Sequence, residues 1–177
     1  MACLDLRGRR CVVVGGGSVG LEKTKGLLAC GARVTVVSPE LHEEMRALDV
    51  TWREGRYRRS DLGGAFLVVA ATSDRSVNER VHRDAEARAM LCNVADVPDL
   101  CNFILPAVHR EGPIAVAVST GGASPALAKR LRAMIAAIVR PEHAELAEEL
   151  RAMRPDVKAR FQSYEERRAH LDDGDVT

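Results

Sequence analysis

The stretch that decides the fold begins with CVVVGGGSVG at Cys11–Gly20 and ends with ARVTVVSPE at Ala32–Glu40. An apolar, Val-rich run leads directly into glycines spaced G-x-G-x-x-G, a helical pattern follows, and a second Val-rich run comes after it. A strand, a glycine loop, a helix and a strand in this order predict the βαβ unit that binds dinucleotides.

Each glycine of the motif has an expected task. Gly15 permits the tight turn after the strand, Gly17 lets a pyrophosphate approach the backbone, and Gly20 lets the helix pack close to the strand. The N-terminus of the helix would offer free N–H groups and the positive end of the helix dipole to the phosphates. The alternative is a plain glycine-rich turn between a strand and a helix, because such turns are common.

Strand and helix patterns continue to alternate as far as residue 96. The continuous apolar run at Ala65–Ala71 is typical of a strand buried on both faces of a parallel sheet. The expected strands are residues 11–14, 33–37, 50–54, 65–71 and 90–94, and the expected helices are residues 19–30, 41–48 and 75–89. This rhythm predicts an α/β fold with a Rossmann-like, doubly wound parallel sheet.

Prolines and turn residues change the pattern after residue 96. A strand is expected at residues 114–118, a turn at 119–123, and then a helix that Ser124 caps and Pro125 starts. Pro141 would stop this helix, and Pro155 would separate two more helices at residues 142–153 and 156–170, before a solvated tail at 172–177. The sheet is therefore expected to be followed by a small strand-plus-helices module.

The composition argues against several classes of function. The 177 residues carry a formal net charge of +1 and only 3% aromatic residues, so neither nucleic acid nor an anionic membrane is favoured as a partner. No apolar run approaches the about 20 residues that cross a bilayer, and Met1–Arg10 lacks the apolar segment of a signal peptide. We therefore expect a cytoplasmic protein.

The five cysteines and five histidines show no metal-binding spacing. The cysteine count is odd, no C-x-x-C pair occurs, and Cys11 and Cys92 lie in apolar strand contexts. Reduced and mostly buried thiols are expected, and no dedicated metal site is predicted.

The end of the second strand is where an NAD-binding site usually places a carboxylate for the ribose hydroxyls. Ser38, Pro39 and Glu40 stand there, and no Arg or Lys follows at once to neutralise a 2′-phosphate. This pattern favours NAD over NADP. Alternatively, Glu40 only starts the next helix, where an acidic residue is favourable in any case.

Two further turns follow strands and could carry chemistry. Asp96 comes directly after the strand at 90–94, where a carboxylate could take a proton from a substrate beside the nicotinamide, although Asp is also a common turn residue. The turn at Ser119–Pro125 could bind an anion, and Lys129 on the following helix would suit a polycarboxylate. The alternative for the turn at 119–125 is that it only caps the following helix and that Lys129 only belongs to a solvated basic face of that helix.

Five motifs in order resemble the siroheme synthase N-terminal family, which comprises precorrin-2 dehydrogenases that in some members are also sirohydrochlorin ferrochelatases. The motifs are GGGSVG at 15–20 with Lys23, AATSD at 70–74 with Asn78, CNVAD at 92–96, FILPA at 103–107 and STGGASPALA at 119–128. Ser18 stands where relatives often have an acidic residue, and Thr120 stands where they often have Ser.

The resemblance implies NAD-dependent oxidation of precorrin-2 to sirohydrochlorin, in which a hydride leaves the macrocycle for the nicotinamide and a proton is removed. It also implies a homodimer whose interface begins near Pro113, and a Ser119–Pro125 turn that lines the tetrapyrrole cleft. Residues 1–112 would form the NAD-binding domain, and residues 113–177 the dimerisation strand and the C-terminal helical region.

The resemblance and the spacing together give one set of site residues. The catalytic residue is Asp96; the cofactor-binding residues are Gly15, Gly17, Ser18, Val19, Gly20, Ser38, Pro39, Glu40 and Thr72; the substrate-binding residues are Ser119, Thr120, Gly121, Gly122, Ser124 and Lys129. Three alternatives stay open: a bifunctional enzyme that also inserts Fe²⁺ into sirohydrochlorin, an NAD-sensing regulatory module without turnover, and a standalone chelatase that binds no dinucleotide.

Overall fold

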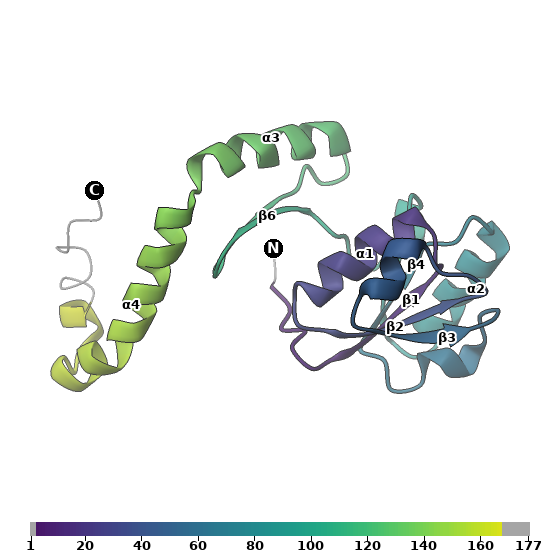
Figure 1. Cartoon of the computed structure of the whole chain (residues 1–177), viewed down its shortest axis with the longest axis horizontal. Coiled ribbons are helices and arrows are strands. Elements are labelled where there is room, and N and C mark those ends of the chain that lie inside the picture. The colour runs from purple at the N-terminus through teal and green to yellow at the C-terminus, as the bar shows by residue number, and fades with distance from the viewer. Residues whose placement is uncertain (1–2, 168–177) are drawn as a thin grey trace. The chain divides into compact units, whose positions relative to one another are not determined.

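A computed structural model describes residues 3–167 (Figure 1). Its contacts divide the chain into two units, Met1–Leu105 and Pro106–Thr177. The sequence placed the domain boundary after residue 112; the strand at Ala107–Glu111 belongs to the second unit because it pairs with the strand at Ile114–Val118.

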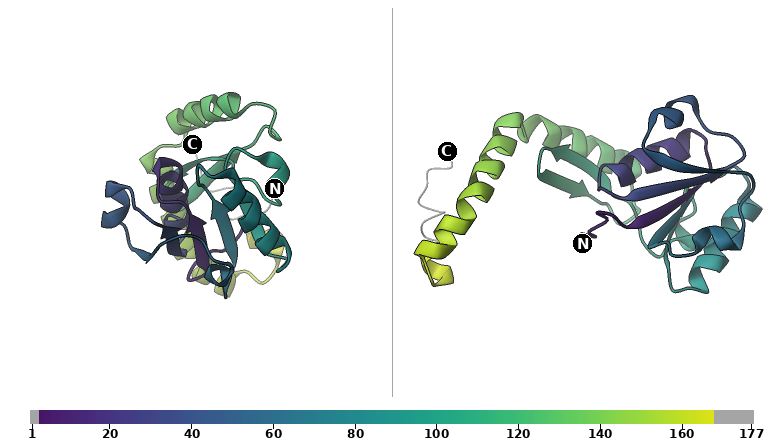
Figure 2. Two further views of the ribbon diagram at one scale, coloured as in Figure 1. Left: turned by 90° about the vertical axis from the view of Figure 1, so that its right-hand side faces the viewer. Right: turned by 60° about the horizontal axis from the view of Figure 1, so that its bottom comes forward.

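The first unit is built on a parallel sheet of five strands in the order β3-β2-β1-β4-β5. The strands are β1 (Arg10–Val14), β2 (Arg33–Ser38), β3 (Val50–Glu54), β4 (Leu67–Ala70) and β5 (Leu91–Val94), and the helices are α1 (Ser18–Leu28) and α2 (Arg75–Glu86). The right-hand view of Figure 2 shows these strands fanning out. The predicted Rossmann-like sheet is confirmed.

The side chains of β1 explain why this strand lies at the centre of the sheet. Cys11 and Val13 point into one apolar core with α1, whereas Val12 and Val14 point into a second core with α2. Both faces of the strand are therefore buried, as its unbroken apolar run indicates. Burial of each Val side chain contributes about 1.5–3 kcal/mol to the stability of the fold.

Short 3₁₀ segments connect several of these elements. They are η1 (Glu43–Ala47), η2 (Arg59–Leu62) and η3 (Pro98–Leu100). The helix expected at residues 41–48 is thus a 3₁₀ turn, which begins where the His42 Nδ1 atom accepts a hydrogen bond from the Glu44 N–H (3.3 Å).

The second unit consists of an antiparallel hairpin and two helices. These elements are β6 (Ala107–Glu111), β7 (Ile114–Val118), α3 (Pro125–Ile138) and α4 (Pro141–Arg160). As predicted, Ser124 caps α3: its hydroxyl accepts a hydrogen bond from the Leu127 N–H (3.2 Å). Figure 2 shows α3 running along the hairpin, and both strands contact it.

The prediction of two helices separated by Pro155 is wrong, because α4 continues through this residue. A proline inside a helix removes one hydrogen bond and strains the preceding turn, but the residues on either side still favour the helix. The last residues of the second expected helix and the expected tail lie outside the described residues. Within residues 3–167, no helix is both long enough and apolar enough to cross a membrane.

Candidate functional site

A cavity of about 1130 Å³ lies in the first unit where the parallel strands end. The loops that follow all five strands contribute to its wall, as expected for the ligand crevice of an open α/β sheet. Every expected cofactor-binding residue except Gly20 lines this cavity, and so does Asp96. The fold therefore brings the glycine loop and the candidate catalytic carboxylate to one space.

The glycine loop is shaped by three close approaches of backbone. A Cβ atom on Gly15 would lie 2.3 Å from the Ala71 carbonyl oxygen, and one on Gly20 would lie 2.1 Å from the Gly15 oxygen. Gly15 also has a φ of +123°, which favours glycine. Gly20 is buried beneath the loop, where it allows α1 to start against the end of β1.

Gly16 is a third close approach, and the spacing argument gave it no task. A Cβ atom there would lie 2.0 Å from the Glu40 carbonyl oxygen and 2.6 Å from the Ser38 hydroxyl. The Gly16 carbonyl oxygen in turn accepts a hydrogen bond from the His42 N–H (2.7 Å). Gly16 thus joins the glycine loop to the loop after β2. The run of three consecutive glycines is the feature of the sequence that could have indicated this role.

Gly17 differs from these three glycines, because a Cβ atom built on it meets no described atom within 4 Å. Gly17 lines the cavity and is the N-cap of α1, with no side chain capping the helix in the described structure. The first turn of α1 also holds no acidic residue. The helix N-terminus therefore faces an open cradle with unpaired N–H groups and uncompensated positive potential, which fits a pyrophosphate.

The loop after β2 is held by the Ser38 side chain. Its hydroxyl donates to the Glu40 carbonyl oxygen and accepts from the Glu40 N–H (3.3 Å), so Ser38 orients this loop. Pro39 and Glu40 are exposed and line the cavity. The exposed Glu40 side chain is thus available to a ligand in this cavity.

The loop after β4 is held by Asn78 on α2, a buried polar residue that the site prediction omitted. Its Oδ1 atom accepts from the Thr72 hydroxyl (2.7 Å) and N–H (3.3 Å), and its Nδ2 atom donates to the Thr72 carbonyl oxygen (2.9 Å). Asp74 then caps α2, and hydrogen bonds from the Ser76 hydroxyl and the Val77 N–H lower the pKa of its carboxyl.

Asp96 follows β5 in a left-handed conformation, with a φ of +61°. Non-glycine residues seldom adopt this conformation, and Asp tolerates it better than most. The carboxylate is exposed and makes no hydrogen bond or ion pair to another described residue. It is therefore free to contact a ligand in the cavity that it lines.

Three further residues line the cavity without a signal in the sequence: Arg56, Tyr57 and Arg80. Arg80 donates to the Tyr57 carbonyl oxygen (3.1 Å) and lies over the Tyr57 ring at 5.4 Å from its centroid. Burial and the hydrogen bond to Asp84 raise the pKa of Tyr57 well above its usual range. Tyr57 is thus a neutral part of the wall, and the two arginines bring positive charge to it.

The expected substrate-binding turn lies in the second unit, and its hydroxyls maintain its shape. The Thr120 hydroxyl donates to the Ser124 carbonyl oxygen (3.1 Å) and accepts from the Ser124 N–H (3.0 Å), and the Ser119 hydroxyl accepts from the Gly121 N–H (3.2 Å). Gly121 and Gly122 have φ values of +62° and +88°. Lys129 is exposed on the first turns of α3.

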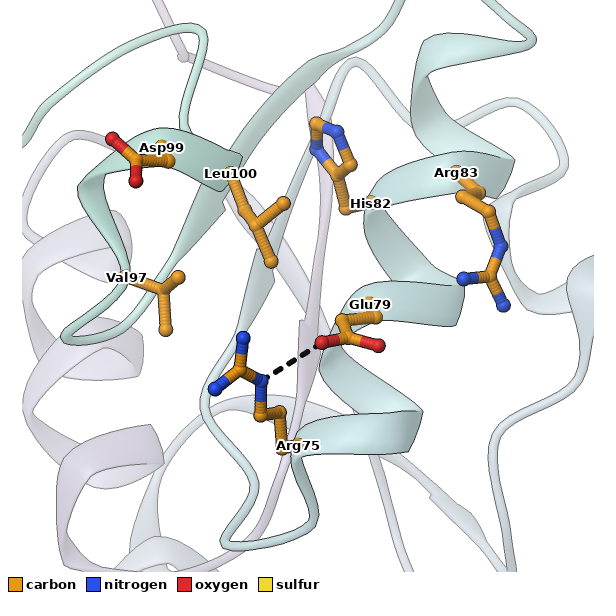
Figure 3. A pocket seen from close by; sticks show the side chains of 7 residues that line it. All are labelled: Arg75, Glu79, His82, Arg83, Val97, Asp99 and Leu100. Atoms are coloured by element: carbon orange, nitrogen blue, oxygen red, sulfur yellow. Dashed lines mark hydrogen bonds and ion pairs between the residues drawn. The ribbon is translucent and has the colours of Figure 1, made fainter.

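A smaller cavity of about 270 Å³ lies between α2 and η3 (Figure 3). Arg75 and Glu79, one turn apart on α2, form an ion pair on one wall of it (2.8 Å), and His82 and Leu100 also line it. Among residues 3–167, no three His, Cys, Asp or Glu side chains come together as a metal site would require.

Comparison with known proteins places this geometry in a family. Residues 2–107 match the family model described as "Putative NAD(P)-binding", and residues 111–138 match the one described as "Sirohaem biosynthesis protein central". The chain belongs to this NAD(P)-binding family, and the segment that follows matches the sirohaem biosynthesis model. The resemblance inferred from the sequence is thereby confirmed, and the glycine loop is that of an NAD(P)-binding family.

Several curated relatives of the chain are siroheme synthases. The protein of Nitrosococcus oceani is 38% identical over 169 residues, which cover 93% of this chain and 36% of the relative. The protein of Methylobacillus flagellatus is 42% identical over 177 residues, which cover 96% of this chain and 37% of the relative. The chain thus spans little more than a third of the length of these relatives.

One solved structure matches nearly the whole chain. It is "SirC, precorrin-2 dehydrogenase", which is 29% identical and has a TM-score of 0.77, with 97% of this chain and 86% of that chain covered. The match includes both the sheet and the module that follows it, so the predicted fold class is confirmed over both units.

Proposed function

We propose that the chain oxidises precorrin-2 to sirohydrochlorin with NAD⁺ as the hydride acceptor. The observation that carries the proposal is that Asp96 and the glycine loop line the same cavity. A solved relative that is itself a precorrin-2 dehydrogenase, together with the siroheme synthases among the curated relatives, supports this choice of reaction.

The residues of the cavity divide the binding of NAD⁺ between two loops. The N–H groups of Ser18 and Val19 hold the pyrophosphate in front of Gly17, where the backbone leaves open space. Glu40 accepts hydrogen bonds from the ribose hydroxyls. A carboxylate at this position disfavours a 2′-phosphate, so NAD⁺ is the preferred form of the cofactor.

Oxidation of precorrin-2 removes two hydrogen atoms from the macrocycle. One leaves with its electron pair as a hydride, for which bound NAD⁺ supplies the acceptor. The other leaves as a proton, and the Asp96 carboxylate takes it, because this exposed carboxylate has no competing partner among the described residues. The products are sirohydrochlorin, NADH and a proton that returns to water.

The second unit supplies the contacts for the acidic groups of the substrate. Precorrin-2 carries acetate and propionate side chains, which pair favourably with cationic groups. Lys129 and the backbone N–H group of Gly122 are the proposed contacts, while Gly121, whose N–H group bonds to the Ser119 hydroxyl, gives the turn its left-handed bend. The hydroxyls of Ser119, Thr120 and Ser124 keep the turn in shape for them.

The chain functions as a homodimer through its second unit. Among residues 106–167, only Ala128 and Val157 are buried apolar residues, so this unit lacks a core of its own. The apolar side chains of Leu127, Leu131, Met134 and Ile138 are instead exposed along one face of α3. A second copy of the chain would cover this stripe and provide the missing core.

An anaerobic absorbance assay tests the proposed reaction. Freshly generated precorrin-2 is incubated with the purified chain, with and without NAD⁺, and a parallel sample contains NADP⁺. The proposal expects sirohydrochlorin and NADH to form together, faster with NAD⁺ than with NADP⁺. If the folded protein binds NAD⁺ but produces no sirohydrochlorin, the proposal fails and a regulatory module is the better account. Addition of Fe²⁺ to the product then measures metal insertion separately.

A further inference from the structure

The turn that presents Asp96 needs an external support. Asp96 is the third residue of the turn Val94–Val97, which is closed by one long hydrogen bond from the Val97 N–H to the Val94 carbonyl oxygen (3.3 Å). Its φ of +61° is a conformation that this turn position usually gives to Gly or Asn. The Asp96 side chain contributes no hydrogen bond or ion pair with another described residue to stabilise the turn.

The Cys101 thiol bridges the two ends of this turn. Its Sγ atom accepts a hydrogen bond from the Val94 N–H (3.1 Å) and lies 3.3 Å from both the Val94 and the Val97 carbonyl oxygens. A thiol carries one hydrogen, so Cys101 donates to one of these carbonyls at a time while its sulfur accepts from Val94. One side chain therefore contacts the residues that immediately enclose Ala95 and Asp96.

Cys101 is itself fixed to the exposed edge of β5 by its neighbour Asn102. The Asn102 Oδ1 atom accepts from the Cys92 N–H (2.8 Å), and its backbone N–H donates to the Cys92 carbonyl oxygen (3.0 Å). Asn93 adds a bond from its Nδ2 atom to the Phe103 carbonyl oxygen (3.0 Å). The segment that carries Cys101 is thus held against the strand that carries Asp96.

We propose that Cys101 is a positioning residue for Asp96, and that its thiol keeps the carboxylate at the place in the cavity where it meets the substrate. This proposal rests on the proposed role of Asp96. Cys101 touches neither substrate nor cofactor; it acts through the geometry of the turn. The sequence signal is a cysteine five residues after the aspartate, which spacing alone did not connect to any chemistry.

The test compares Cys101→Ala with Cys101→Ser and uses Cys92→Ala as the matched control. Cys92 lies on β5, the strand that leads to Asp96, and its side chain is wholly buried in the core. Its loss removes packing near Cys101 but none of the hydrogen bonds that the Cys101 thiol makes to the turn. We expect Cys101→Ala to lower kcat by about 10-fold to 100-fold, because the Asp96 carboxylate would be displaced from its position. The Kd for NAD⁺ should stay unchanged. Cys101→Ser should restore part of the loss, because a hydroxyl can make the same bonds. Cys92→Ala should lower the Tm and leave kcat within about twofold.

Amide hydrogen exchange gives a second readout that does not depend on activity. Exchange at Val94 and Val97 should accelerate in Cys101→Ala and stay unchanged in Cys92→Ala. Unchanged exchange at both positions would overturn the proposal whatever the rates of turnover show. A loss of kcat that is equal in the Cys101 and Cys92 variants would overturn it as well.

A double variant separates this proposal from the proposed function. If Cys101 acts through Asp96, Cys101→Ala should cause no further loss of turnover in an Asp96→Asn background. A full additional loss would show that Cys101 acts by another route, which overturns the proposal. If Asp96→Asn alone leaves turnover unchanged, the catalytic role of Asp96 has failed, and the positioning of Asp96 by Cys101 for the reaction fails with it. The exchange data would then still show whether the thiol holds the turn.

Discussion

At the residue scale, the glycines of the loop divide into those that the fold needs and one that the ligand needs. Added Cβ atoms on Gly15, Gly16 and Gly20 would collide with backbone, whereas one on Gly17 would project into open space. The φ of Gly17 is −83°, which suits any residue. Gly17 can therefore be replaced without strain, and the consequence should fall on the ligand.

The variant Gly17→Asp should bind NAD⁺ at least about 100-fold more weakly, because a carboxylate at the pyrophosphate position repels it. The stability of the fold should stay the same or rise by about 0.5–1 kcal/mol, since Asp is a better N-cap than most residues and the site has no side-chain cap. Isothermal titration and urea unfolding measure the two effects.

Gly26→Ala is the control for this variant. Gly26 lies on α1 outside the cavity, and a Cβ atom there meets no described atom within 4 Å. Replacement by Ala should stabilise the helix by about 1 kcal/mol and leave the Kd for NAD⁺ unchanged. Equal affinity of Gly17→Asp and the wild type would show that the phosphates bind elsewhere.

Sequence reasoning reached Gly15, Gly17 and Gly20 because their tasks depend on the local order of strand, turn and helix. It gave no task to Gly16, whose partner Glu40 lies in another loop that only the folded sheet brings near. It gave none to Asn78 either, because the contact with Thr72 six residues earlier depends on how the loop after β4 turns into α2. For the same kind of reason, the sequence did not indicate that Arg56 and Arg80 line the cavity. Arg56 reaches the wall from the loop after β3, and Arg80 reaches it from α2.

At the element scale, the order of the strands puts the loops after β1 and β4 side by side. β1 pairs with β2 on one edge and with β4 on the other, so the chain reverses its winding direction between them. The apolar runs of the sequence predicted these strands well. They missed β6, since AVHRE alternates weakly and prolines stand directly before it and in the turn that follows it.

Asn78→Ala tests how strongly α2 holds the loop after β4. Removal of the amide leaves Thr72 without three hydrogen bonds, so the free energy of unfolding should fall by about 1–3 kcal/mol. NAD⁺ binding should weaken in the same variant, because Thr72 lines the cavity. Urea unfolding and a binding titration check both effects.

The neighbouring variant Glu79→Ala serves as the reference for the Asn78 experiment. It removes an exposed ion pair with Arg75, which should change stability by less than about 1 kcal/mol and leave the loop intact. If the two variants unfold at the same urea concentration, the Asn78 bonds do not hold the loop.

At the scale of the whole molecule, the two units differ in how they are stabilised. The first has two apolar cores, one on each face of its sheet. The second has almost no buried side chains among its described residues, and Met134 and Ile138 are 58% and 69% exposed. A two-stranded hairpin needs apolar burial against other elements to be stable, and the described residues of this unit bury very little, which is why the second unit is expected to require a second copy of the chain.

A Met134→Asp, Ile138→Asp double variant should convert a dimer into a monomer, because two charges on the apolar stripe of α3 oppose its burial. Ala136→Asp is the matched control: Ala136 is exposed on another face of the same helix and should leave the dimer intact. Sedimentation velocity measures the outcome. A wild-type chain that sediments as a monomer at high concentration would contradict the proposed assembly.

The central claim is that dehydrogenation takes place where Asp96 meets the dinucleotide, and single-turnover NADH formation by Asp96→Asn tests it most directly. The reference is Asp99→Asn, an exposed carboxylate close by that lines the smaller cavity instead. We predict that Asp96→Asn binds NAD⁺ normally and forms NADH at least about 100-fold more slowly from precorrin-2, while Asp99→Asn matches the wild type. NADH formation by Asp96→Asn within about twofold of the wild-type rate would contradict the account.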